Sequence, residues 1–286
     1  MPLATFGERR ARFRALLAAD EVNIPGSVFD AVSARLAQAS GYKLGLMGGS
    51  VASAVTLGAP DIVVLTLSDF VEQARRISRA SDLPLMVDAD HGYGNALNVR
   101  RTVEDLEAAG VAALTIEDTL LPRRYGGNAG ELISREELGA KLRAAIDARG
   151  DPSLVIIGRT GGVTRGGIDE AVARARVCAE AGVDAIFPTG ISSIEQVDAL
   201  ASAVELPLLL NALPVPDETL VANRIRVAMQ GHLPYYVALK ALWDSYQLLR
   251  AGGSPDELRK LALPAELQKV ALAEDEYARQ ASDYLQ

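Results

Sequence analysis

Acidic side chains of the kind that hold divalent metal ions stand close together in two short segments of the sequence. Asp88 and Asp90 follow one apolar run, and Glu117 and Asp118 follow another. Crowded carboxylates repel one another unless some are protonated or a cation is bound. With one cysteine and two histidines in the chain, an all-oxygen ligand set selects a hard ion, Mg²⁺ or Mn²⁺. The alternative is that these acids cap helices or pair with neighbouring arginines.

Groups suited to binding an anionic substrate follow other apolar runs. Gly48, Gly49 and Ser50 offer backbone N–H groups and a hydroxyl to a carboxylate or phosphate, although a Gly-Gly pair is more often a tight turn. Arg159 carries a planar guanidinium that matches a carboxylate, and its alternative role is a structural ion pair. We therefore expect a small ligand that bears a carboxylate or phosphate at this place.

Two further polar side chains join these candidates. Asn211 ends one apolar run, and His232 follows the next. A lone histidine is more often structural, but the position of His232 beside the other candidates favours a role in the site. His91 follows the acidic pair and is expected to order that loop. Cys178 lies in a helical pattern of small apolar residues and is predicted to be buried.

Short apolar runs alternate with helical patterns, and these elements must position the candidates. The runs predicted to be strands are 21–24, 44–47, 85–87, 112–116, 154–157, 185–187, 206–210 and 226–229. They are apolar on both faces, which is typical of parallel strands buried beneath helices. We predict an α/β fold, a (β/α)8 TIM-type barrel whose site lies at the carboxyl ends of the strands. A doubly wound open sheet is the alternative, without the Gly-rich fingerprint of dinucleotide binding.

Helical patterns at 69–80, 97–109 and 235–249 complete the predicted barrel, which we expect to form a single domain over residues 1–286. The arginine-rich start of the chain predicts an amphipathic helix with Phe13, Leu16 and Leu17 inward, and not a targeting signal. Residues from about Pro255 onward predict a helical tail that packs on the barrel or exchanges with a neighbouring subunit.

Glycines mark several predicted boundaries of these elements. Gly110, Gly150 and Gly182 each follow a helical pattern and are expected to adopt positive φ as caps. The glycine-rich segment 161–167 is expected to be a mobile loop after the fifth strand.

The composition narrows the function classes. The chain of 286 residues is 49% hydrophobic and 23% charged, as in ordinary globular proteins. Its net charge of −8 disfavours nucleic acids and anionic membranes as partners. No apolar run approaches the roughly 18 residues that span a bilayer. One cysteine excludes a disulfide within the chain and favours a cytoplasmic location.

Three segments resemble the phosphoenolpyruvate mutase/isocitrate lyase superfamily: Gly-Gly-Ser-Val-Ala at 48–52, Val-Asp-Ala-Asp-His-Gly-Tyr-Gly-Asn at 87–95 and Leu-Thr-Ile-Glu-Asp at 114–118. The resemblance runs from about residue 8 past the predicted eighth helix and, with Gly231-His232, is closest to the oxaloacetate decarboxylase branch. It implies a Mg²⁺-dependent barrel, usually a homotetramer with its last helix exchanged between subunits. The implied reaction converts oxaloacetate to pyruvate and CO2 through a metal-stabilised enolate.

The resemblance also implies roles for individual residues. Asp88 would be the direct metal ligand, and the metal's waters would be held by Asp61, Asp90 and Glu117. Ser50, the backbone of Gly48 and Gly49, and Arg159 would bind the substrate carboxylate, with His232 as the distinctive substrate contact of the branch. His232 and Arg159 are the predicted catalytic residues, and Asn211 joins the substrate-binding set by its position.

Two departures from the superfamily pattern shape the expected activity. Lyases of the superfamily carry a cysteine-bearing loop after the fourth strand, but residues 119–128 contain no cysteine. Cleavage of isocitrate or methylisocitrate is therefore not expected. Gly161-Gly162 replaces the acidic residue and alanine of many relatives. The alternatives are an enzyme of the same superfamily acting on another α-keto acid, a 2-substituted malate or phosphonopyruvate, or a catalytically silent keto-acid-binding barrel.

Overall fold

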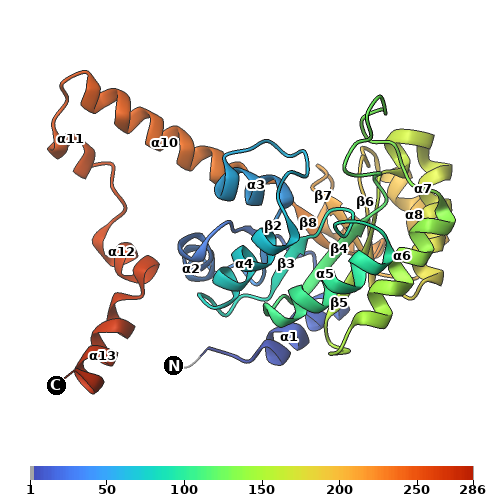
Figure 1. Cartoon of the computed structure of the whole chain (residues 1–286), viewed down its shortest axis with the longest axis horizontal. Helices are drawn as coiled ribbons and strands as arrows, with labels where there is room; N and C mark the ends of the chain where they lie inside the picture. Colours follow the sequence, from blue (N-terminus) through green and yellow to red (C-terminus); the bar gives the residue numbers. More distant parts are fainter. Residues whose placement is uncertain (1–2, 286) are drawn as a thin grey trace.

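Residues 3–285, the part of the chain that the computed structural model describes, contain eight parallel strands in one curled sheet (Figure 1). Strands that are consecutive in the chain are neighbours in the sheet. Their bounds are β1 Gly26–Ser27, β2 Gly45–Met47, β3 Leu85–Asp88, β4 Ala113–Glu117, β5 Val155–Thr160, β6 Ala185–Pro188, β7 Leu208–Asn211 and β8 Ile225–Met229. Asn23 forms a parallel bridge with Val227 and so joins β8 to the segment before β1. The predicted TIM-type α/β fold is confirmed.

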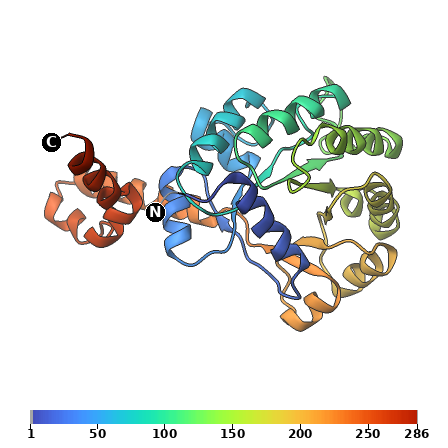
Figure 2. The same cartoon turned by 90° about the horizontal axis from the view of Figure 1, so that it is seen from below.

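The helices between consecutive strands cover the outside of the sheet (Figure 2). Their bounds are α1 Phe6–Ala18, α2 Ala31–Ala39, α3 Gly49–Leu57, α4 Leu67–Ser78, α5 Ala96–Ala108, α6 Arg135–Ala148, α7 Gly162–Glu180, α8 Ile194–Ala203, α9 Asp217–Ala222, α10 Leu233–Arg250, α11 Pro255–Arg259, α12 Ala265–Leu272 and α13 Glu274–Tyr284. Side-chain caps start several of them, such as Thr5 for α1 and Asp30 for α2. Within residues 3–285, none has the length and apolar character that a membrane span requires.

Apolar side chains of the strands fill two regions of the core. One lies between the sheet and the surrounding helices. The other fills the barrel interior, where Phe13 and Leu17 of α1 join the inward residues of the strands. Phe13 is fully buried, and α1 lies across the end of the barrel where the strands begin (Figure 2). The predicted first helix and the inward position of Phe13 and Leu17 are confirmed, but its buried residues also include Arg9 and Arg10. Burial of the strands on both faces explains their continuous apolar runs.

Several local predictions were wrong. The run 21–24 is not a strand, and β1 begins after Pro25, which lacks the N–H that a ladder needs. The segment 161–167 is not a loop: α7 begins at Gly162 and bends at Gly167, where φ is 75°. A Cβ at Gly162 would lie 2.8 Å from Cα of Ala171, so the glycine allows this close packing. Gly150 does not adopt positive φ, unlike Gly110 and Gly182.

Helices α10–α13 form an arm that leaves the barrel (Figure 1). Helix α10 has no buried residue within the described structure, although it carries exposed apolar side chains that include Leu242, Trp243 and Tyr246. The arm folds back at α12, where Arg35 of α2 donates to the carbonyl oxygen of Ala271 at 3.1 Å. The predicted helical tail is confirmed, and its exchange between subunits stays a prediction.

Candidate active site

A cavity of about 310 Å³ lies at the carboxyl ends of the strands. Its lining residues come from most of the barrel: Leu46, Gly48, Ser50, Asp61, Met86, Asp88, Thr115, Arg159, Phe187, Thr189, Asn211, Met229, Gly231 and His232. The sequence candidates that line it are Gly48, Ser50, Asp61, Asp88, Arg159, Asn211 and His232. Gly49, Asp90 and Glu117 are not among the lining residues.

The Gly48–Ser50 segment starts a helix and does not form a separate turn. Gly48 is the N-cap of α3, so the backbone N–H groups that follow it belong to the first turn. These N–H groups have no acceptor within the helix and carry the positive end of its dipole. A carboxylate or phosphate in the cavity finds donors here, and the Ser50 hydroxyl adds another.

Asp88 is the acid at the centre of the site. β3 ends at this residue, and its carboxylate accepts from Thr115 Oγ1 at 2.8 Å and pairs with Arg159 Nη1. Burial opposes ionisation, but the charge of Arg159 and the Thr115 hydrogen bond hold the pKa of Asp88 below its usual value. Asp88 is therefore a carboxylate with its charge facing the cavity, and its side chain is 23% exposed.

Asp90 and Glu117 lie beside Asp88, and the positive charge near these acids is too small to balance their negative charges. Arg159 Nη2 is 3.0 Å from Glu117 Oε2, and no other ion pair to these acids occurs within residues 3–285. Burial, together with the charges of Asp88, Glu117 and Asp61, raises the pKa of Asp90 to about 8. Burial also raises the pKa values of Asp61 and Glu117.

This donor set fits a divalent cation. Four acids crowd around one arginine, and the raised pKa values of three of them, Asp61, Asp90 and Glu117, indicate a local excess of negative charge that a cation would relieve. Within residues 3–285, no three His, Cys, Asp or Glu side chains surround a common metal position. The arrangement therefore suits a hydrated ion that touches few protein ligands, as Mg²⁺ does, better than a closed protein cage.

Asp90 lies beyond the end of the strand that carries Asp88. Because β3 ends at Asp88, Asp90 does not continue the strand alternation, and its φ is 47°. Its carbonyl oxygen accepts from the N–H of Glu117 at 2.8 Å. A Cβ at Gly49 would lie 3.0 Å from the Asp90 carboxylate, so the glycine makes room for this acid.

Asp118 does not join the acidic cluster. Its side chain is fully buried and accepts from Thr160 Oγ1 at 2.5 Å and from the N–H of Gly161 at 2.9 Å. Arg174 of α7 completes the group at 3.1 Å. Asp118 thus stabilises the connection between β5 and α7. For this acid, the structural role that was the alternative to metal binding is the correct one.

His232 reaches the cavity from the start of α10. It is the N-cap position of that helix, and its Nδ1 lies 2.7 Å from Ser27 Oγ on β1. Burial lowers the pKa of His232, although the nearby charge of Asp88 opposes the shift. The imidazole is therefore neutral at neutral pH. Asn211, at the end of the neighbouring strand β7, is exposed and also lines the cavity.

Three residues of the site were missed in the sequence. Thr115 bonds Asp88, the Phe187 ring lies 5.6 Å from the Arg159 guanidinium carbon, and Ser27 bonds His232. Thr115 precedes Glu117 by two positions in one strand, so its polar side chain in an apolar run was a usable signal. Ser27 and Phe187 gave no such signal because their partners lie far away in the sequence.

The fold and the site define a class: a parallel α/β barrel with an acidic, cation-suited cavity at the carboxyl ends of its strands. The comparison with protein families agrees, because the phosphoenolpyruvate phosphomutase family model matches residues 13–249. This chain belongs to the phosphoenolpyruvate phosphomutase family.

Individual relatives are similar over the whole chain. An oxaloacetate decarboxylase of Bradyrhizobium sp. (strain ORS 278) is 49% identical over 284 residues, which cover 98% of each protein. Among solved structures, oxaloacetate acetylhydrolase with the product oxalate is 29% identical, with a TM-score of 0.85 and coverage of 98% of this chain and 99% of that one. Phosphonopyruvate hydrolase with oxalate and Mg²⁺ is 26% identical, with a TM-score of 0.85 and coverage of 99% and 100%.

Proposed function

We propose that this protein is an oxaloacetate decarboxylase that requires Mg²⁺ and releases pyruvate and CO2. The observation that carries the proposal is that Asp61 and Asp88, the helix start at Gly48 and Ser50, and His232 line one small cavity. A second line of support is that the chain is 49% identical, over nearly its full length, to a protein named oxaloacetate decarboxylase.

Asp88 would hold the metal directly, and Asp61, Asp90 and Glu117 would hold its waters. When bound, Mg²⁺ supplies a Lewis acid for the α-keto carboxylate group; Mn²⁺ has the same preference for oxygen ligands and could replace it. The raised pKa of Asp90, which reflects burial and three neighbouring acids, supports a cation at this place. The structure of phosphonopyruvate hydrolase with oxalate and Mg²⁺ is a related precedent.

The start of α3 and Arg159 would bind and orient the keto acid. Ser50 and the N–H groups after Gly48 offer hydrogen bonds to a carboxylate. Arg159 stays cationic, because Asp88 and Glu117 outweigh its burial and raise its pKa. Its Nε is buried and has no hydrogen-bond partner among residues 3–285, so one donor of the guanidinium is unsatisfied in this structure.

Decarboxylation then breaks the bond between C3 and the C4 carboxylate of oxaloacetate. The electron pair of that bond forms the C2–C3 double bond, and negative charge develops on the C2 oxygen as CO2 leaves. His232, as a neutral imidazole, would donate a hydrogen bond to this charge or orient the departing carboxylate. Protonation at C3 then restores the C2 carbonyl and gives pyruvate; bound water and His232 are the two candidate donors.

Two wider properties belong to the same proposal. The exposed apolar face of α10 supports a homotetramer whose C-terminal helices are exchanged between subunits. The single cysteine, which is buried and unpaired, suits the reducing cytoplasm that we propose as the location.

The test measures pyruvate release from oxaloacetate by chelator-treated protein, before and after Mg²⁺ is added. Because free Mg²⁺ itself promotes loss of CO2 from this acid, each rate is corrected with a reaction that contains the metal and no protein. We expect protein-dependent turnover with Mg²⁺ or Mn²⁺ and none after chelation.

A panel of acids separates the alternatives. Turnover of phosphonopyruvate or a 2-substituted malate, with no turnover of oxaloacetate, would assign another reaction of the family. Tight binding of oxalate with no turnover of any acid in the panel would favour a keto-acid-binding barrel without activity.

A further inference from the structure

One ring nitrogen of His232 is hydrogen-bonded to another side chain, and the other ring nitrogen faces the cavity. Nδ1 lies 2.7 Å from Ser27 Oγ, which is the only hydrogen bond found for that hydroxyl within residues 3–285. A Cβ at Gly48 would lie 2.2 Å from Nε2, so this nitrogen stands directly over the Gly48 backbone. The ring is therefore fixed between β1 and the start of α3.

The charges around Nε2 decide which nitrogen carries the proton. Asp61 and Asp88 line the same cavity, and the Asp88 charge acts on the imidazole. A lone pair on Nε2 would be repelled by these carboxylates and by an anionic substrate, whereas an N–H is attracted. In the neutral ring, Nδ1 then has a free lone pair, which must accept from Ser27.

We propose that Ser27 is a positioning residue for the decarboxylation, because its hydroxyl donates to Nδ1 and fixes His232 as the Nε2–H tautomer with that N–H facing the substrate. This inference rests on the proposed function for its effect on turnover, but the tautomer is a property of the free protein. Ser27 touches no substrate and acts through the imidazole alone.

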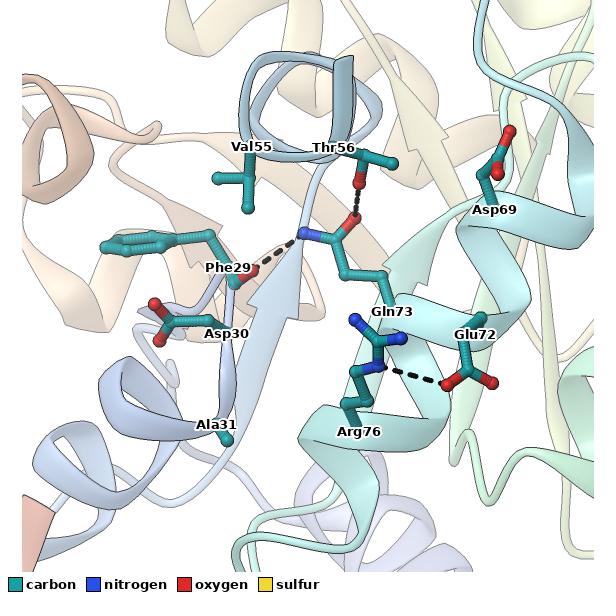
Figure 3. Close-up of a pocket in the computed structure, with 9 residues that line it drawn as sticks. All are labelled: Phe29, Asp30, Ala31, Val55, Thr56, Asp69, Glu72, Gln73 and Arg76. Atoms are coloured by element: carbon teal, nitrogen blue, oxygen red, sulfur yellow. Dashed lines mark hydrogen bonds and ion pairs between the residues drawn. The ribbon is translucent and has the colours of Figure 1, made fainter. Parts of the chain in front are cut away.

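The segment that carries Ser27 is braced on two sides. Gln73 of α4 donates from Nε2 to the carbonyl oxygen of Phe29 at 2.7 Å, and its Oε1 accepts from Thr56 Oγ1 of α3 at 3.1 Å (Figure 3). The Phe29 ring meets the edge of Tyr235, in the first turn of α10, with ring centroids 5.1 Å apart. The chain after Ser27 is thus held against the same helix start that carries His232.

Nitrogen NMR of protein labelled with ¹⁵N-histidine reads the tautomer directly. The chain has two histidines, so the His232→Gln variant assigns the two ring systems by removing one of them. In the wild-type protein we expect His232 with the proton on Nε2. In Ser27→Ala we expect a mixture of tautomers, and in Ser27→Thr, which keeps a hydroxyl, we expect recovery of the Nε2–H form.

Kinetics of the same variants measure the effect on the reaction. We expect Ser27→Ala to lower kcat about 5-fold, on the scale of one hydrogen bond, with KM nearly unchanged, and Ser27→Thr to restore most of it. The matched control is Ser40→Ala, which removes a hydroxyl that bonds the Leu36 carbonyl at the far end of α2. We expect wild-type kcat there.

Distinct results overturn the inference. An Nδ1–H ring in the wild-type protein would do so, as would an unchanged tautomer in folded Ser27→Ala. Equal kcat in Ser27→Ala and Ser40→Ala would remove the effect on turnover. If Ser27→Ala fails to fold, the wild-type and Ser27→Thr spectra still decide the tautomer. If wild-type protein does not decarboxylate oxaloacetate, the proposed function fails while the spectra still test the Ser27 contact.

Discussion

Arg159 on β5 pairs with Asp88 on β3 across the intervening strand β4. The same guanidinium reaches Glu117, so one arginine joins the ends of three strands. If Asp88 is the direct metal ligand, as we propose, the arginine and the cation share one carboxylate. Metal binding then includes the free-energy cost of rearranging a buried ion pair. The acids of the site are therefore expected to contribute unequally to metal affinity.

Replacement of the proposed metal ligands separates direct from indirect roles. We expect Asp90→Asn to weaken Mg²⁺ binding by about 10- to 100-fold, the range for groups that orient a ligand, and Asp88→Ala to weaken it more. Titration calorimetry with Mg²⁺ on chelator-treated protein measures both affinities, and circular dichroism controls for folding. Wild-type affinity in Asp88→Ala would contradict the assignment.

The stability of the metal-free protein is expected to fall as pH rises. Asp90 has a pKa raised from 3.8 to about 8 by burial and by the acids around it, so the folded state binds its proton more tightly than the unfolded state. The contribution of Asp90 to stability is therefore complete below about pH 4 and is lost as pH rises toward 8.

Melting temperatures with chelator present, compared between pH 5 and pH 9, check this dependence. Relative to the wild-type protein, Asp90→Asn should lose less stability over that range, by a Tm difference of about 2–4 °C or more. Added Mg²⁺ should reduce the difference. Parallel curves for the two proteins would show that Asp90 does not titrate in this range.

Gly48→Ala tests the close approach of His232 to the backbone. The backbone of Gly48 has φ −87° and ψ 154°, which alanine adopts without strain, so the effect is purely steric. The new Cβ would lie 2.2 Å from Nε2 and must displace the imidazole. We expect kcat to fall on the order of 10- to 100-fold, as for loss of a donor to the transition state.

Gly7→Ala is the matched control for that change, because a Cβ at Gly7 meets nothing within 4 Å. Steady-state kinetics of both variants should show normal turnover for Gly7→Ala. Normal turnover for folded Gly48→Ala would mean that the His232 position is not needed.

Substitution of His232 itself distinguishes a catalytic from a structural role. Loss of one donor costs on the order of 10²–10³-fold in strong cases, and a cation that carries most of the charge would lower this to about 10- to 100-fold in kcat. His232→Gln keeps an amide donor and should lose less than His232→Ala. If both variants lose only thermal stability while kcat per folded molecule stays normal, His232 is structural.

Cys178 is expected to take no part in the reaction. It is fully buried on α7, and burial raises the pKa of its thiol to about 12, so the group is neither accessible nor ionised at neutral pH. Cys178→Ser should leave oxaloacetate turnover per folded molecule unchanged, at a small cost in stability. The same assays should find no cleavage of isocitrate or 2-methylisocitrate, since no cysteine stands in residues 119–128. Loss of turnover in folded Cys178→Ser, or cleavage of either acid, would contradict this assignment.

The sequence by itself determined the order of the elements and most of the candidate residues. Apolar runs such as 85–87 and 185–187 became β3 and β6 almost unchanged, because strands buried on both faces must be apolar throughout. Polar residues directly after such runs, such as Asp88 and Arg159, reach the cavity because parallel strands end on the same side.

Only the tertiary structure decided how these groups divide their roles. Asp118 follows Glu117 in the chain, yet it bonds Thr160 and Gly161 and leaves the acidic cluster. Ser27 and His232 lie 205 positions apart, and closure of the barrel between β8 and the segment before β1 brings them within 2.7 Å. Contacts of that kind depend on packing between distant segments, which no local spacing of residue types encodes.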